Sequence, residues 1–261
     1  LGPDSTAFTT PDHTIYHLEL PLAGAATLGE GPRAFREYAE NVTFDPALIE
    51  KERGVVLSEL ATRETPQSRA ADYNLRFLWP HALEVRRKPI GEPALLRTFK
   101  REQFTAFYDA WYRPERMAVI VVGDLEPAAA ERSIAEHFAT LAARAPARPL
   151  PADLRTAEAA APNVGVFADP GLIGVILTFE HAVQKPRTED THARRVQDLR
   201  ASVAFGMFHA RLQKLAAQPE ATFVAPVATF GNAIRDWQVA ALSASAKIDD
   251  WSKAAAQIEQ E

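Results

Sequence analysis

The sequence predicts an α+β protein in which helices pack on one face of a mostly antiparallel sheet. Short alternating apolar segments, typical of strands, are interspersed with longer segments whose apolar residues recur at helical spacing. The second half of the chain repeats the strand–helix–strand content of the first half. We therefore expect two related lobes that pack together as one unit.

The first lobe is predicted to span residues 1–145. Its clearest helix begins at Asp45-Pro46, because Asp suits the N-cap position and Pro suits the first helical position. Another helix is closed by Arg113-Pro114. The elements expected in this lobe are strand segments on either side of Pro11-Asp12, helices at Leu28–Val42, Pro46–Arg63, Ser68–Trp79, Arg101–Trp111 and Glu126–Ala143, and an apolar strand at Met117–Val122.

Residues 146–162 are rich in Ala and Pro, which is typical of a linker. The second lobe is predicted to span residues 163–261. Its long helix carries a stripe of apolar residues that we interpret as core. The elements expected there are strands at Asn163–Phe167, Gly174–Phe179, Thr222–Thr229 and Trp237–Ser245, and helices at Asp190–Ala217 and Asp249–Glu261.

Composition excludes several classes of function. The chain has 261 residues, of which 47% are hydrophobic and 24% are charged, with a formal net charge of −5. No basic face is expected, so nucleic acid is not a predicted partner. No apolar run approaches the length of a membrane span. The absence of Cys excludes disulfides and Cys-based zinc sites. The composition is that of a soluble protein, and both the periplasm and the cytoplasm remain open.

The helix at Pro46–Arg63 carries two carboxylates on one face. Glu52 and Glu59 are seven residues apart, so they share a face with their backbones roughly 10 Å apart. Both side chains can point into one site, but they are not equivalent ligands of one metal ion. One suits a metal ligand and the other an electrostatic partner of that ligand. The alternative is a solvated acidic face with Arg53 and Arg63 nearby.

Three blocks of sequence carry a family resemblance. FDPALIEKERGVVLSEL, from Phe44, resembles the distal-glutamate helix of the insulinase/pitrilysin family of zinc metallopeptidases, which includes the mitochondrial processing peptidases. KPIGEPALLRTFKREQFTAFYDAWYRPERMAVIVVGDL resembles the family's next block. STAFTTPDHTIYHLEL resembles its Asn-Ala-Phe-Thr strand and the strand that follows. The three blocks stand in the family's order and cover about Ser5–Leu125. The resemblance implies that the two lobes form one metallopeptidase half.

The resemblance also implies roles for individual residues. Glu59 matches the third zinc ligand of the family, and Glu52 matches a second glutamate that supports catalysis without being the main ligand. Ala7, between Thr6 and Phe8, matches the strand that binds peptide substrate by backbone pairing. Thr6 stands where the family usually has Asn, so this position offers a hydroxyl in place of an amide.

The family's zinc site also needs His-x-x-Glu-His on a helix, and this chain has no such motif. Of its seven histidines, only His13 and His17 are spaced i,i+4. Their segment reads as a strand, on which residues four apart lie about 13 Å apart, so the pair cannot bind one zinc ion. We therefore interpret the chain as a fragment that begins after the metal-binding helix. Zn²⁺ is expected in the intact parent, and none is expected on this fragment.

The function predicted from the sequence is a fragment of a zinc-dependent metalloendopeptidase that hydrolyses peptides, itself inactive because the His-x-x-Glu-His helix is absent. Its predicted partners are a peptide substrate and a second family half or partner subunit. Two alternatives stay open. One is a non-catalytic partner or scaffold subunit of the same family, and the other is a peptide-binding module that does not hydrolyse.

Overall fold

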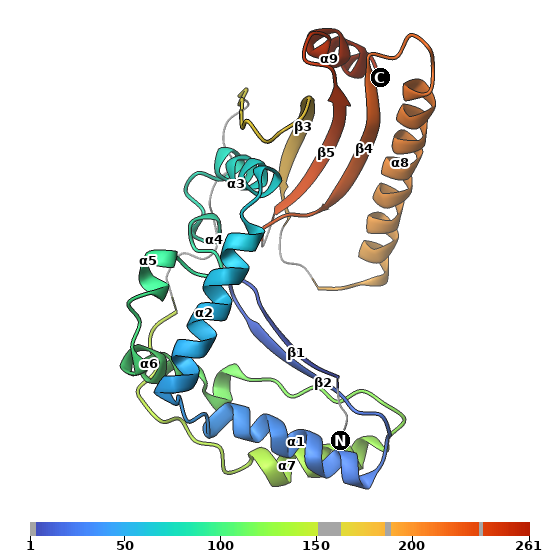
Figure 1. Ribbon diagram of the computed structural model, residues 1–261. Helices are drawn as coiled ribbons and strands as arrows, with labels where there is room; N and C mark the ends of the chain where they lie inside the picture. The colour runs from blue at the N-terminus through green and yellow to red at the C-terminus, as the bar shows by residue number, and fades with distance from the viewer. Residues whose placement is uncertain (1–3, 151–162, 186–188, 235–236) are drawn as a thin grey trace. The chain divides into compact units, whose positions relative to one another are not determined.

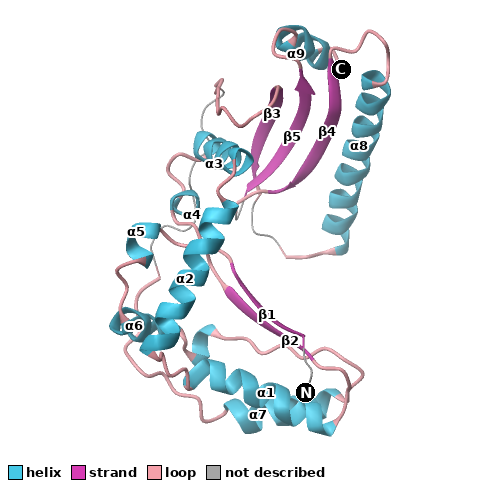
Figure 2. Cartoon of the chain, in the orientation of Figure 1, coloured by secondary structure: helices cyan, strands magenta, loops and turns pink. Residues whose placement is uncertain are grey.

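The protein combines helices and antiparallel strands along its whole length, which confirms the predicted α+β class (Figures 1 and 2). The computed structural model describes residues 4–150, 163–185, 189–234 and 237–261. These residues divide between two compact units. The first comprises Leu1–Arg63 with Arg87–Ala152, and the second comprises Glu64–Arg86 with Asp153–Glu261. Each unit is described by itself below.

The first unit holds one β-hairpin and most of the shorter helices. The hairpin pairs antiparallel strands around a turn closed by a 2.8 Å hydrogen bond from the Thr10 N–H to the His13 carbonyl. Helix α1 packs along helix α7. The elements are strands β1 (Asp4–Thr9) and β2 (Thr14–Glu19), helices α1 (Ala25–Glu40), α2 (Pro46–Arg63), α5 (Pro93–Leu96), α6 (Arg101–Trp111) and α7 (Pro127–Phe138), and the 3-10 turn η1 (Pro114–Arg116).

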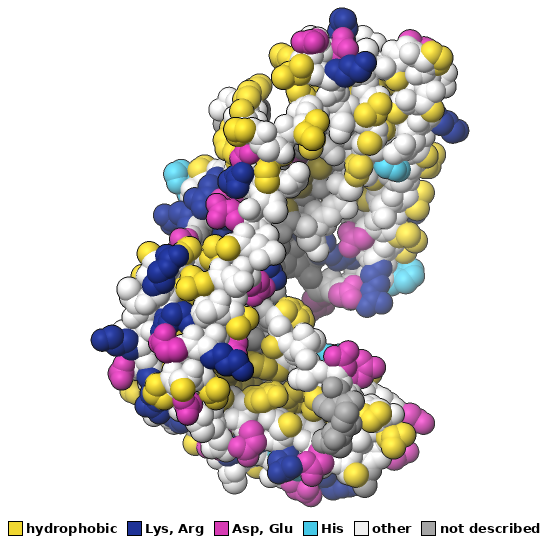
Figure 3. Space-filling model, viewed as in Figure 1, with side chains coloured by type: hydrophobic (Ala, Val, Ile, Leu, Met, Phe, Trp, Pro, Cys, Tyr) yellow, Lys and Arg dark blue, Asp and Glu magenta, His cyan; other side chains and the backbone are white. Residues whose placement is uncertain are grey.

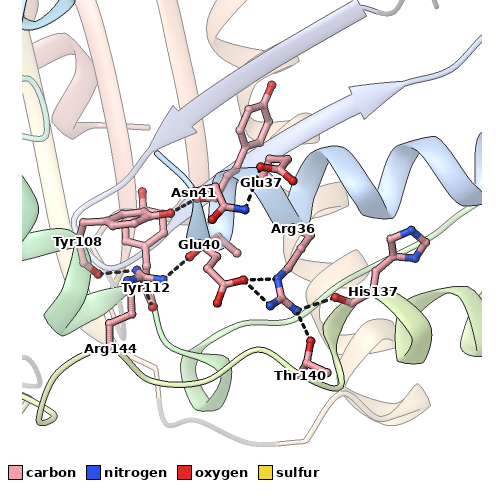
Figure 4. Close-up of polar contacts among 11 residues, drawn as sticks. Arg36, Glu37, Glu40, Asn41, Tyr108, Tyr112, His137, Thr140 and Arg144 are labelled. Atoms are coloured by element: carbon pink, nitrogen blue, oxygen red, sulfur yellow. Dashed lines mark hydrogen bonds and ion pairs between the residues drawn. The ribbon is translucent and has the colours of Figure 1, made fainter. Parts of the chain in front are cut away.

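Arg144 joins the ends of α1 and α6. Its guanidinium donates to the Asp109 carboxylate at 2.8 Å and to the Ala39 carbonyl at 2.9 Å. It also lies 4.1 Å from the centre of the Tyr108 ring (Figure 4). It also donates to the Tyr112 carbonyl at 3.3 Å. Helix ends leave carbonyls without intrahelical partners, and one cation satisfies the last carbonyls of both helices here.

Arg36 has a similar role at the end of α7. It pairs with Glu40 on its own helix and donates to the His137 carbonyl at 2.7 Å and to the Thr140 hydroxyl at 3.2 Å (Figure 4). The sequence predicted this helix to reach Ala143, but α7 ends at Phe138. The bond from Arg36 satisfies a terminal carbonyl of the shorter helix, so the chain turns earlier than apolar spacing alone indicated.

The second unit is built on a three-stranded antiparallel sheet with strand order β3-β5-β4. Helix α8 packs against β4. The register of β4 shifts between Val224 and Val227, and Ala225 has a φ of 48°, so a bulge bends this strand. The elements are helices α3 (Pro66–Leu78), α4 (Leu83–Arg86), α8 (His192–Ala216) and α9 (Trp251–Glu259), and strands β3 (Val175–Gln184), β4 (Phe223–Asn232) and β5 (Trp237–Ala246).

The main core of this unit lies between the sheet and helices α8 and α9. Leu212 and Phe223 are fully buried in it, and Ile258 of α9 completes it. Leu177, Phe179 and Leu242 contribute from the strands. The apolar stripe predicted for α8 is therefore core only toward its C-terminal end, because Leu199 and Val203 are exposed.

A smaller apolar cluster surrounds Trp79, just after α3. Trp79 is fully buried and packs edge-on against Trp237 at 6.3 Å between ring centres. Ala182 and Val239 of the sheet also contact this cluster. Neighbouring strand residues alternate between faces, so these two lie on the face opposite the one that α8 covers. The sheet thus carries α8 on one face, as expected, and the segment around Trp79 on part of the other.

Two predicted strands are wrong. Met117–Val122 and Asn163–Phe167 are extended but belong to no sheet among the described residues. Val122 is 91% exposed. Phe167 instead packs on Tyr73 at 5.3 Å between ring centres. An apolar run makes a strand only where another strand offers a hydrogen-bonding partner, and neither segment meets one in the described part of the chain.

The predicted lobe boundaries, 1–145 and 163–261, stay a prediction. Most of the predicted linker, residues 151–162, lies outside the described residues. Residues 64–86, which the sequence analysis placed in the first lobe, pack within the second unit together with β3 and β5. Residues 64–86 belong to the second unit because the buried Trp79 side chain packs against apolar residues of that unit's sheet.

We predict that Leu212→Ala lowers the free energy of unfolding of the second unit by about 2–5 kcal/mol, because it leaves a cavity in a fully buried site. Leu199→Ala is the matched control on the same helix, where the side chain is 63% exposed, and it should change stability by less than about 0.5 kcal/mol. Urea unfolding measures both. Equal effects of the two substitutions would contradict the assigned core.

Candidate functional site

Helix α2 carries the two candidate carboxylates and has the predicted bounds, Pro46–Arg63. Its start is held by Asp45, whose carboxylate accepts hydrogen bonds from the N–H groups of Ala47 at 2.7 Å and Leu48 at 3.3 Å. These bonds satisfy donors that a helix start leaves without partners. Pro46 needs none, because it has no N–H. The Asp-Pro pair is thus the local reason why the helix begins here.

Glu59 stands in the last turns of α2 with an accessible carboxylate. Its side chain is 43% exposed, and Oε1 pairs with Arg63 at 2.5 Å. The carboxylate is therefore paired but still partly exposed to solvent. Glu59 lines a shallow open hollow together with other residues of the same helix, namely Lys51, Gly54, Val55, Ser58, Thr62 and Arg63. One carboxylate oxygen at an open hollow suits a single zinc ligand.

Glu52 is exposed on the same helix and does not line that hollow. Two helical turns separate it from Glu59, a rise of roughly 10 Å. Glu52 is therefore suited to an electrostatic role and not to the same coordination position as Glu59. Both glutamates stay assigned to the site by the sequence pattern and by the resemblance.

Helix α2 buries none of its side chains. Its apolar residues Leu48 and Val55 are exposed. Hydrophobic side chains are visible at many points on the surface in the space-filling view (Figure 3). Polar contacts therefore contribute much of what holds α2. Among them, Arg53 pairs with Glu50 at 2.9 Å and donates to the carbonyls of Leu96 and Phe99.

The candidate peptide-binding strand is β1. Thr6, Ala7 and Phe8 are all exposed, and β1 pairs only with β2 among the described strands. Its other edge thus offers backbone N–H and C=O groups to an added strand. Ala7 stands directly opposite Tyr16 in the hairpin register.

Tyr16 ties this hairpin to the end of α6. Its hydroxyl lies 2.5 Å from that of Tyr112, and its ring packs at 6.3 Å from the Tyr112 ring. Burial raises the pKa of the Tyr112 hydroxyl above its usual value, and the hydrogen bond with Tyr16 raises it further. The Tyr112 phenol therefore stays neutral at physiological pH. Its hydrogen bond with Tyr16 ties the residue opposite Ala7 to the end of α6.

The histidines are not assembled into a metal site. His17 stands opposite Thr6 in the hairpin, and His13 bonds to Asp12 at 2.7 Å and to Thr10 at 2.9 Å in the turn. Within the described residues, no group of three or more His, Cys, Asp or Glu side chains is placed to hold a metal ion. Glu59 is thus a candidate for one ligand of a site whose other ligands lie elsewhere.

Sequence reasoning missed two residues that shape this region. Arg53 was interpreted only as part of a solvated face, yet its guanidinium bonds backbone carbonyls that lie more than forty positions away. Tyr112 was not singled out within its sequence block, although its hydroxyl contacts that of Tyr16, which stands opposite Ala7. The sequence gives only a weak signal for these roles. Neither an Arg inside a helix nor a Tyr near a Pro indicates which distant residue it contacts.

Three comparisons place the chain among known proteins. Residues 98–191 match the model described as the Peptidase M16 inactive domain. The chain is 30% identical over 142 residues to the probable zinc protease PqqL of Escherichia coli, which covers 54% of this chain and 15% of that protein. The PqqL of Haemophilus influenzae is 33% identical over 123 residues, covering 47% of this chain and 13% of that protein. These matches confirm the predicted resemblance to the insulinase/pitrilysin, or M16, family.

Solved structures of M16 proteins share the fold. The periplasmic protease PqqL of Escherichia coli superposes with a TM-score of 0.80 and 24% identity, over 98% of this chain and 28% of that one. Pitrilysin superposes with a TM-score of 0.65 and 17% identity, over 97% of this chain and 27% of that one. The chain therefore corresponds to a minor part of the length of these M16 relatives. None of its described helices is long and apolar enough to cross a membrane.

We predict that this chain alone does not bind zinc tightly, because Glu59 is a single carboxylate ligand and water competes for the remaining positions. Isothermal titration calorimetry with zinc should show no stoichiometric binding at micromolar or lower concentration. Tight binding that disappears when histidines of this chain are replaced would contradict the prediction.

Proposed function

We propose that this chain is part of a zinc-dependent metalloendopeptidase, in which α2 supplies Glu59 as the third metal ligand. The observation that carries the proposal is the position of Glu59, whose side chain is 43% exposed and lines an open hollow while Oε1 pairs with Arg63. The M16 relatives named zinc proteases support it. The two imidazole ligands and the base glutamate would come from outside this chain.

Bound at such a site, zinc would polarise a water molecule and the substrate carbonyl, which is the chemistry of metal-assisted peptide hydrolysis. This chain would contribute three things. Glu59 would hold one coordination position, and Glu52 would adjust the electrostatic field of the site two helical turns away. Strand β1 would align the peptide by pairing backbone groups along its open edge, with Thr6 offering a hydroxyl beside Ala7.

The parent would enclose its peptide between two halves, so a second M16 half or partner subunit is the proposed partner. Exposed apolar side chains on both α2 and a later segment of the chain support such a covering partner, because a partner would remove them from water. Among them are Leu48 and Val55 on α2, and Ile120 and Val122 in the extended segment that joins no described sheet.

One observation favours a second candidate, a non-catalytic scaffold subunit. The matched family model describes an inactive domain, and its match begins at residue 98, after α2. In a scaffold, Glu52 and Glu59 would have no metal to serve. The test below separates the two candidates, because only the peptidase retains zinc through Glu59.

We predict that the two carboxylates have different effects in the longer protein that joins this chain to a His-x-x-Glu-His helix. Glu59→Gln should lower zinc content, because a neutral amide is a poorer zinc ligand than a carboxylate. Glu52→Gln should keep most of the zinc and lower turnover on the order of 10–100-fold. Elemental analysis beside peptide hydrolysis measures both, and Glu64→Gln, an exposed carboxylate just after α2, is the control.

Loss of zinc from the Glu52 variant with retention in the Glu59 variant would reverse the two roles. A parent that holds no zinc at all would favour the scaffold. A parent that holds zinc and binds peptides without cleaving them would favour the peptide-binding module.

A further inference from the structure

Arg53 stands out among the charged residues of α2, the others of which are exposed. Its side chain is 13% exposed, whereas the side chain of its ion-pair partner Glu50 is 68% exposed. The guanidinium is covered because it reaches the turn that follows α5 and donates to the carbonyls of Leu96 and Phe99. Hydrogen bonds from a charged donor are about twice as strong as neutral ones. This is the part of α2 with the strongest described contacts beyond its own helix.

The other described anchor of α2 lies at its start. The Phe44 ring packs against Tyr108 at 5.1 Å between ring centres, and Arg101 donates to the Phe44 carbonyl at 3.1 Å. Asp45 then caps the helix. These contacts fix where α2 begins. Farther along the helix, where Glu52 and Glu59 stand, the apolar side chains of α2 are at most partly buried, so a polar contact can decide how the helix is rotated.

The direction of Arg53 suits it to fix that rotation. At 100° per residue in an ideal helix, Arg53 projects about 100° around the axis from Glu52 and about 120° from Glu59. It therefore faces the α5 turn while the two glutamates project elsewhere. Any rotation or lateral shift of α2 that moved the glutamates would have to break the bonds to Leu96 and Phe99.

We propose that Arg53 is a positioning residue of the M16 site. It holds the rotation of α2 against the connection between α5 and α6, and so aims the Glu59 carboxylate without touching metal or substrate itself. The inference rests on the proposed function of Glu59. It also joins two of the sequence blocks that carry the family resemblance, since Arg53 lies in one and Leu96 and Phe99 lie in the next.

The chain contains a matched control for Arg53. Arg33 on α1 also pairs with a glutamate three residues earlier, Glu30 at 2.5 Å, and the glutamate raises its pKa as Glu50 raises that of Arg53. Arg33 is 64% exposed, and among the described residues its hydrogen bonds go to Glu30 alone. The two arginines therefore differ mainly in the carbonyl contacts that the inference concerns.

The first measurement is hydrogen–deuterium exchange of the whole chain, read at the backbone amides of α2. Arg53→Met keeps an unbranched, flexible stem and removes the guanidinium donors, so exchange over residues 54–63 should rise by about tenfold or more. Arg53→Lys keeps one charged donor group, so its exchange rate over α2 should lie between those of the unchanged protein and Arg53→Met. Arg33→Met should leave exchange of α2 unchanged. If Arg53→Met has no more effect on α2 than Arg33→Met, Arg53 does not hold the helix and the inference is overturned.

The second measurement places the same variants in the zinc-containing parent and follows zinc loss to a competing chelator. The rate of zinc loss should be about tenfold higher for Arg53→Met than for Arg33→Met, because the Glu59 ligand is no longer held in place. Loss of zinc equal to that of the control would show that Arg53 does not aim Glu59, whatever the exchange result. A wild-type parent without zinc would refute the proposed function itself, and the inference with it.

Discussion

Helix α2 must hold two carboxylates in place although its apolar side chains are at most partly buried, and the rest of the site depends on how it does so. The hydrophobic effect supplies most of the rigidity of a typical helix through its apolar face. Here Leu48 and Val55 are exposed, and a cap at Asp45 together with the guanidinium of Arg53 replaces that face. Charged hydrogen bonds are directional, so a few of them can set the rotation of a helix that packing leaves undetermined.

The same device recurs in the first unit. Arg36 and Arg144 each bind carbonyls at the ends of helices, and Arg144 also stacks on Tyr108 (Figure 4). The second unit is organised differently, around a dry core in which Leu212, Phe223 and Ile258 are buried between helix and sheet. The first unit, which carries the candidate site, thus uses arginine–carbonyl contacts, whereas the second unit relies on apolar packing.

The sequence was most informative where local chemistry decides the structure. Asp45-Pro46 and Arg113-Pro114 mark helix boundaries by capping and by the geometry of Pro, and α2 and α6 have the predicted bounds. Predictions failed where the outcome depends on distant partners. Met117–Val122 has the composition of a buried strand but meets no partner strand in the described residues. The predicted lobe boundaries stay a prediction, and residues 64–86 pack with the second unit around Trp79. For the site, Glu52 and Glu59 followed from spacing and resemblance, while the contacts of Arg53 and Tyr112 could not be read from either.

The central claim is that Glu59 binds a metal ion completed by ligands from outside this chain. The most direct measurement is X-ray diffraction at the zinc absorption edge, on crystals of the longer protein that carries this chain and a His-x-x-Glu-His helix. The account predicts one anomalous peak about 2.0–2.2 Å from a Glu59 carboxylate oxygen, with no such peak at Glu52. A zinc peak that is ligated without Glu59, or a protein of intact motif that holds no zinc, would contradict it.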